Sequence, residues 1–275
     1  MPPKRAVAFA LAAAVLFGAS TPAAKILAGE MPAFLLAGLL YAGSGIGLSL
    51  WIALRSAMAP TSESSTRSPP LTRADLPWLA GAVVSGGIAG PVLLMLGLAT
   101  TAASTASLLL NLEGMFTALI AWFVFRESFD RRIALGMALI VAAGVLASLE
   151  PASLGNISSG APFVAAACLA WAIDNNLTRR VSAGDPVTIA AIKGIVAGAV
   201  NISIALWAGS AMPSAVQVVA SAAVGLFGYG VSLALFVVAL RELGTARTGA
   251  YFSIAPFAGI GLALAALGET PGAMF

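Results

Sequence analysis

The sequence predicts an all-α membrane protein: a polytopic membrane helix bundle built from two inverted five-helix repeats. Three observations lead to this prediction. First, 60% of the 275 residues are hydrophobic and only 9% are charged, whereas soluble domains carry about 25% charged residues. Second, apolar segments long enough to cross a bilayer recur along the whole chain. Third, residue patterns of the first half return in the same order in the second half.

Nine apolar segments have about the 20 residues that a membrane-spanning helix needs. A membrane barrel would instead show ten-residue segments of alternating polarity, and the sequence shows none. The expected helices are, in order, residues 6–27, 33–54, 76–98, 103–125, 132–149, 160–179, 187–208, 215–239 and 246–267.

The first of these segments resembles a secretory signal peptide, because Lys4 and Arg5 precede an apolar run and small residues. The run continues to about Leu27, which is long enough to span, so we expect a retained first helix. A Ser/Pro-rich polar loop within residues 55–75 is expected to be loosely ordered.

The internal repeat becomes visible when the second half is placed on the first. The matched pairs, at a shift of 154 and then of 142 residues, are Phe17 with Trp171, Ser20 with Asp174, Gly86 with Gly228, Leu98 with Leu240 and Glu127 with Glu269. The polar loop absorbs most of the difference between the two shifts. Each unit should hold five spans, so the second copy enters the membrane from the opposite side. This arrangement is typical of secondary transporters, whose substrate site lies near the midplane.

The two units differ at their ends. The first repeat, residues 1–150, continues after Glu127 with the segment 132–149, whereas only six residues follow Glu269 in the second repeat, residues 151–275. Either a tenth helix is missing or the protein has nine spans, and we favour a truncated chain with an incomplete second repeat.

The distribution of basic residues predicts the orientation. If the N-terminus is cytoplasmic, 12 of the 14 Lys and Arg residues fall at the inner face, as the positive-inside rule requires. The exceptions are Lys25, in an outer loop, and Lys193, within a span.

Three stretches carry a resemblance to a known family. FGASTPAAK in the first span, LLLNLEGMFTALIAWFVFRES in the fourth and GAYFSIAPFAGIGLALAALGET in the ninth resemble the EamA-type family of the drug/metabolite transporter superfamily. The resemblance implies a bacterial inner-membrane transporter of ten helices in two inverted units, often exporting amino acids or other small metabolites. The missing tenth span departs from that pattern.

Glu113 is the one charged residue between Ala102 and Phe125. A lone carboxylate at the centre of a bilayer costs roughly 2.5–3.5 kcal/mol by insertion scales, so it must face protein or a wet cavity. It is either a structural acid hydrogen-bonded to neighbours such as Asn111, or a cavity-facing acid that binds a cation or a proton. We favour the cavity-facing interpretation.

Asp174 and Lys193 form a second candidate pair. Both should lie roughly 10 Å inside the same membrane face, at 1.5 Å rise per residue. Adjacent antiparallel helices would join them as a structural salt bridge or as a gating pair.

The remaining candidates are polar, aromatic or proline residues within the spans. We expect a cavity lined by spans one, three, four, six, eight and nine, with Pro91 and Pro256 as hinges. The candidate substrate-binding residues are Glu113, Asn111, Trp171, Asn175, Tyr229, Tyr251 and Ser20.

The sequence therefore predicts a secondary transporter that moves a small metabolite by alternating access, with membrane lipid as its surroundings. A single cysteine, Cys168, and no histidine leave no disulfide framework or metal cluster. The absence of a nucleotide-binding motif predicts gradient-driven transport without a cofactor or a nucleic-acid partner. An intramembrane lipid-modifying enzyme and a non-transporting scaffold are the alternatives. Substrate, direction, coupling ion and a homodimeric state are left open.

Overall fold

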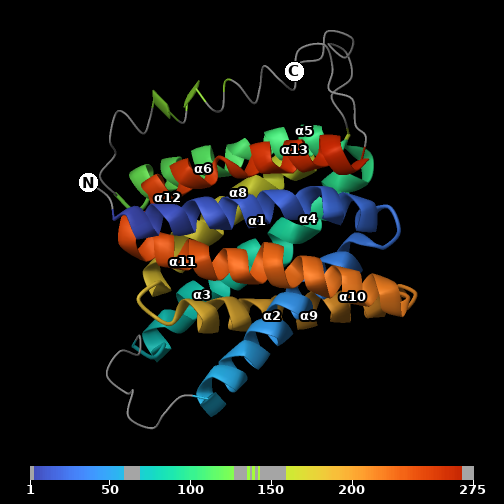
Figure 1. The fold of residues 1–275 in the computed structure, drawn as a ribbon, viewed down its shortest axis with the longest axis horizontal. Coiled ribbons are helices and arrows are strands. Elements are labelled where there is room, and N and C mark those ends of the chain that lie inside the picture. The colour runs from blue at the N-terminus through green and yellow to red at the C-terminus, as the bar shows by residue number, and fades with distance from the viewer. Residues whose placement is uncertain are drawn as a thin grey trace.

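The structure, a computed structural model, describes residues 3–58, 69–126, 135–136, 138–139, 142 and 159–267. The elements assigned within this part of the chain are all helical and form one bundle (Figure 1). In order they are α1 (Lys4–Ala28), α2 (Ala33–Met58), η2 (Arg73–Asp75), α3 (Leu76–Ala82), η3 (Val83–Ala89), α4 (Gly90–Thr100), α5 (Ala103–Leu109), α6 (Asn111–Phe123), α8 (Ala161–Val181), α9 (Pro186–Trp207), α10 (Ala215–Val224), η5 (Gly225–Val231), α11 (Ser232–Leu243), α12 (Thr245–Phe252) and α13 (Ala255–Leu267).

Seven continuous helical segments of the described chain are long and apolar enough to cross a membrane. They correspond to seven of the nine predicted spans, with α3, η3 and α4 forming one of them. The predicted span 160–179 forms α8, a helix of 21 residues that is too polar to meet the same criterion. Almost all of the predicted span 132–149, the centre of the polar loop and the last eight residues lie outside the described residues. The multi-pass helical class is confirmed, and the count of nine stays a prediction.

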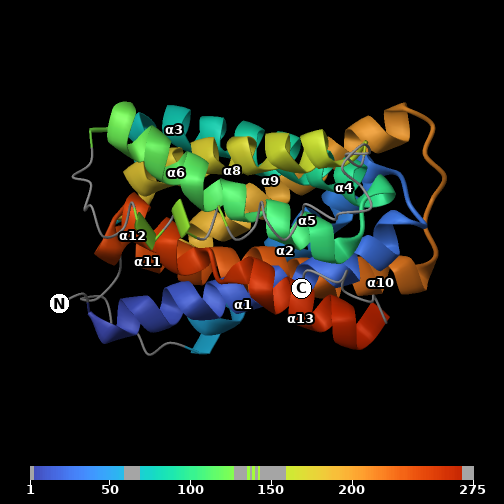
Figure 2. The same ribbon diagram turned by 90° about the horizontal axis from the view of Figure 1, so that it is seen from above.

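Helices α1 and α8 run in opposite directions. At the end of α1, Lys25 Nζ donates a hydrogen bond of 2.8 Å to the Thr101 carbonyl that follows α4. At the start of α8, Gly160 packs so closely on the end of α4 that a Cβ there would overlap Gly97 O. The end of α1 and the start of α8 therefore lie at the same face of the bundle (Figures 1 and 2).

Many contacts in the bundle join a helix of the first half to a helix of the second half. α1 packs against α11 as α8 packs against α4, and α1 packs against α12 and α13 as α8 packs against α5 and α6. α2 packs against α9, and the α5–α6 span packs against the α12–α13 span. The neighbours of α1 in the first half therefore match those of α8 in the second half.

The backbones of α2 and α9 approach each other closely where the two helices cross. A Cβ on Gly45 would lie 2.3 Å from Ile195 N, and one on Gly198 would lie 2.6 Å from Ala42 N. Only glycine permits this approach, because any side chain would overlap the facing backbone.

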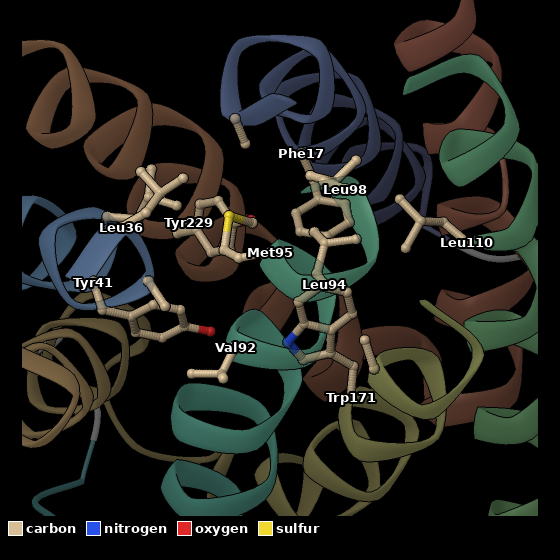
Figure 3. Packing of buried hydrophobic residues seen from close by; sticks show 14 of the residues in the cluster. Phe17, Leu36, Tyr41, Val92, Leu94, Met95, Leu98, Leu110, Trp171 and Tyr229 are labelled. Carbon is tan, nitrogen blue, oxygen red and sulfur yellow. The ribbon is translucent and has the colours of Figure 1, made fainter. Parts of the chain in front are cut away.

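Two π-helical segments interrupt the spans, η3 in the first half and η5 in the second, each seven residues long. Their bounds differ by 142 residues at both ends, which is the shift that relates Gly86 to Gly228. A π-helical turn shifts the hydrogen-bond register and frequently accompanies a functional site. Both segments border the largest cluster of buried apolar residues, part of which Figure 3 shows.

Candidate functional site

A cavity of about 50 Å³ lies where α1, α2, α6, α8, η5, α11 and α12 meet. Elements of both halves contribute to its wall, which is mainly apolar with two acidic side chains. The lining residues are Phe17, Tyr41, Glu113, Trp171, Asp174, Asn175, Gly228, Tyr229, Ser232, Leu233, Phe236 and Phe252.

Glu113 lies in the first turn of α6, where the helix dipole favours a negative charge. Its side chain is buried, with 6% of the residue exposed, and its Oε1 accepts a hydrogen bond of 2.9 Å from Asn175 Nδ2. The same Nδ2 also donates to Thr117 Oγ1. Within the described chain, no lysine or arginine pairs with Glu113. The carboxylate therefore has one neutral donor and no cation, which makes it available to a ligand or a proton.

The carbonyl oxygen of Gly86 organises the opposite part of the wall. In η3, the Gly90 N–H donates to Ser85 O five residues earlier, so the donor for Gly86 O in this register would be Pro91, which has no N–H. Instead, Tyr41 Oη donates to Gly86 O at 2.7 Å and Trp171 Nε1 donates to it at 2.9 Å. Figure 3 shows the Tyr41 hydroxyl and the Trp171 ring nitrogen pointing toward one another. Two aromatic rings are thereby held in fixed orientations.

Asp174 and Lys193 form a buried ion pair beside the cavity. Lys193 is 0% exposed, and its Nζ donates to both carboxylate oxygens of Asp174, at 2.7 Å for Oδ2, and to Thr178 Oγ1 at 3.1 Å. An ammonium group has three donors, so these bonds use all of them. The charge of Asp174 is therefore balanced within the protein, while that of Glu113 is not.

Aromatic rings make up much of the wall. The Phe17 ring centroid lies 5.4 Å from that of Trp171, 5.7 Å from that of Tyr229 and 5.5 Å from that of Phe252. Tyr41 and Tyr229 lie 5.4 Å apart. These contacts join rings from α1, α2, α8, η5 and α12 into one continuous surface.

The structure brings Glu113, Trp171, Asn175 and Tyr229 of the predicted substrate contacts to the cavity, together with Asp174. The other three predicted contacts lie elsewhere. Asn111 Nδ2 donates to Leu108 O within its own span, and Ser20 Oγ donates to Phe17 O. Tyr251 is half-buried and packs in a separate cluster with Ala6 and Ala10. Glu113 does not bond to Asn111, because both side chains turn to partners in other directions.

Sequence reasoning missed several wall residues, chiefly Phe17, Tyr41, Ser232, Phe236 and Phe252. It placed the third span on the wall, where the structure has Tyr41 of the second span. Phe17 carried a signal, because it pairs with Trp171 in the internal repeat. Nothing in the apolar sequence of α2 indicated which of its faces turns inward.

The two predicted hinge prolines each stand second in a helix but differ in what precedes them. Pro91 is the second residue of α4, directly after η3, and Pro256 is the second residue of α13, after the turn that ends α12. Pro256 follows a turn, and the first turn of a helix tolerates proline because its N–H would be unpaired there. Pro91 also leaves Gly87 O without its α-helical donor, and Asn201 Nδ2 donates to that oxygen at 3.1 Å.

No group of three or more Cys, Asp or Glu side chains in the described chain is placed to hold a metal ion. The one cysteine, Cys168, is buried and free.

Comparisons with known proteins agree with this architecture. The sequence profile of the EamA-like transporter family matches the chain twice, over residues 4–149 and 158–274. A curated relative from Methanothermobacter thermautotrophicus, described as an uncharacterized transporter, is 29% identical over an alignment of 261 residues that covers 90% of this chain and 75% of that protein. A protein of known crystal structure matches with a TM-score of 0.75 and 18% identity over 99% of this chain and 91% of its own. At that identity the likeness concerns the fold alone.

Proposed function

This chain belongs to the EamA-like transporter family, and we propose that it is a secondary transporter that exports a small metabolite with a cationic group, a class that includes amino acids and amines. Family and relative point to a membrane transporter rather than an enzyme. The proposal adds the site and the mechanism: binding at Glu113 in the central cavity, and alternating access from the two faces of the membrane.

The observation that carries the proposal is the state of Glu113 within the bundle. A buried carboxylate without a cationic partner among the described residues is costly in a membrane, and intramembrane ionisable groups usually mark a substrate or ion path. A scaffold gains nothing from such a group. A transporter uses it, because a cation or proton that enters the cavity relieves the cost.

Alternating access is supported by the exchange of neighbours between the halves. α1 and α8 run in opposite directions and have matching neighbours, and η3 and η5 recur at the shift of the repeat. Two inverted five-helix units that rock against each other around a central site would account for this pattern.

The cytoplasmic N-terminus is supported by the helix directions. Basic residues gather at the face where α1 begins, whereas Lys25 lies at the opposite face, where α1 ends. Those at the first face are Lys4, Arg5, Arg55, Arg73, Arg126, Arg179, Arg180, Arg241 and Arg247. A cytoplasmic location of this face follows the positive-inside rule.

The test is flux in proteoliposomes, measured for a panel of amines, amino acids and neutral metabolites with and without a proton gradient. We expect one class to be transported and the Glu113→Gln variant to lose at least about tenfold of that flux, since breaking a buried charge pair costs several kcal/mol. The matched control is Glu30→Gln, an acid that bonds to Gln217 at an exposed position. Unchanged flux in the Glu113→Gln variant would remove this carboxylate from the mechanism.

A further inference from the structure

We infer that the central cavity selects an organic ammonium ion that lacks a carboxylate, a primary or methylated amine, over the free amino acid of the same side chain. The inference rests on the proposed function only in taking this cavity as the substrate site. It is carried by three properties of the wall: its charge, its aromatic surface and its supply of hydrogen-bond donors.

The charge of the wall favours a cation. Glu113 and Asp174 are its acidic residues, and the lining residues include no lysine or arginine. Lys193 balances Asp174 from a fully buried position behind the wall. One negative charge, on Glu113, remains without a partner in the described chain, and a bound ammonium group would supply that partner.

The aromatic surface favours the same ligand. Four aromatic rings that line the cavity form a chain of contacts with centroid distances of 5.4–5.7 Å. The chain runs from Trp171 to Phe17, then to Tyr229 and Tyr41. Ring faces attract ammonium groups within about 6 Å, most strongly where water is excluded. An acid beside such a surface is a combination suited to a cation rather than to a neutral compound.

The donors of the wall are already used by the protein. Tyr41 and Trp171 donate to Gly86 O, and Ser232 Oγ donates to Ala13 O. The Asn175 amide nitrogen has two hydrogens, which go to Glu113 and Thr117.

Tyr229 adds one further hydroxyl to the wall. A carboxylate can accept about four hydrogen bonds, and burying it without a cation or enough donors is strongly unfavourable. The α-carboxylate of an amino acid would find too few hydrogen-bond donors in this wall and would be repelled by the charge of Glu113. The wall therefore excludes the carboxylate that distinguishes an amino acid from its amine.

The test uses the full chain in lipid nanodiscs and three probes that share one side chain: 2-phenylethylamine, L-phenylalanine and 2-phenylethanol. A second matched pair is tryptamine and L-tryptophan. We expect calorimetric titration to give affinities for the amines at least about tenfold above those for the amino acids and the alcohol. Amino acids that bind as tightly as their amines, or amines that do not bind, would overturn the inference.

Two variants separate the contributions, and size-exclusion elution and thermal unfolding check that each is folded. Glu113→Gln should remove the preference for 2-phenylethylamine over 2-phenylethanol, whereas Glu113→Asp, which keeps the charge, should retain a preference. Phe17→Leu should weaken amine binding by about threefold to tenfold and leave alcohol binding nearly unchanged. A preference that survives Glu113→Gln contradicts the inference, and the wild-type ligand series decides the question if that variant does not fold.

The result also distinguishes this inference from the proposed function. Gradient-dependent flux of amino acids without binding of amines would uphold the transporter and refute the selectivity. Selective binding of amines without flux of any probe would uphold the selectivity and refute the transporter.

Discussion

The π-helical segments η3 and η5 are equal in length and occupy equivalent positions in the two halves, yet they contribute to the cavity in different ways. η3 contributes backbone: its Gly86 and Gly87 carbonyls accept hydrogen bonds from three side chains of other helices. η5 contributes a side chain, because Tyr229 lines the cavity directly.

One residue accounts for much of the difference. Pro91 stands where the π-helical donor of Gly86 O would be, and it has no N–H. Its counterpart at the shift of 142 residues is Leu233, which retains its N–H. An N–H that could serve the Gly228 carbonyl is therefore present within its own helix, whereas Gly86 O takes its donors from Tyr41 and Trp171.

The residues that face the two segments differ as well. A Cβ on Gly86 would overlap Asp174 Oδ2, and one on Gly228 would lie 2.4 Å from Ser20 Cβ. Asp174 and Ser20 are themselves counterparts in the repeat, so this is the same contact made twice. The same backbone contact therefore involves a buried ion pair on the Asp174 side and an uncharged side chain on the Ser20 side.

The largest expected effect comes from breaking the buried ion pair between Lys193 and Asp174. Lys193→Met leaves Asp174 buried beside Thr178 without its cation, which should lower the free energy of unfolding by about 3–5 kcal/mol. The measurement is a denaturant titration of the purified protein in detergent.

Two further variants control this result. Ser20→Ala, at the equivalent point of the other half, should cost about 1 kcal/mol or less, since Ser20 only bonds to the Phe17 carbonyl. Adding Asp174→Asn to Lys193→Met should restore most of the lost stability. A Lys193→Met variant as stable as the wild type would mean that the pair is not a structural element.

A smaller effect is expected from filling the close contact at η3. Gly86→Ala forces a Cβ to within 1.8 Å of Asp174 Oδ2, and overpacking of this kind costs about 1–3 kcal/mol. Gly261→Ala in α13 is the matched control, because a Cβ there meets nothing within 4 Å. Thermal unfolding should show a lower midpoint for Gly86→Ala only; equal midpoints would contradict the packing described here.

The smallest effect compares the two tyrosines. Tyr41→Phe removes the hydrogen bond to Gly86 O and should cost about 0.5–1.5 kcal/mol. Tyr229→Phe should change stability by a few tenths of a kcal/mol at most, because Tyr229 packs on Phe17 and Tyr41 through its ring, which the substitution keeps. The measurement is the difference between the thermal unfolding midpoints of the two variants. A larger loss of stability in Tyr229→Phe than in Tyr41→Phe would contradict the roles assigned to η3 and η5.

Much of the architecture follows from the sequence, because apolar length and the positions of Gly86 and Gly228 are properties of the chain itself. Glu113 could be singled out for a similar reason: a lone acid in an apolar span must face protein or water. Tyr41 could not, since α2 is apolar on all sides and its rotation is set by the contact with α9 rather than by polarity. The π-helical segments also escaped prediction, because their register depends on neighbours such as Trp171 as much as on local residues.

The crossing of α2 and α9 has a mechanical consequence. Backbone meets backbone at Gly45, Gly194 and Gly198, so the two helices leave no room for a side chain at these three positions. A slide of α2 along α9 would push side chains against the facing backbone, whereas a rotation about the crossing would keep the glycine contacts. If the bundle opens as proposed, the contact therefore favours rotation of the two helices about this point.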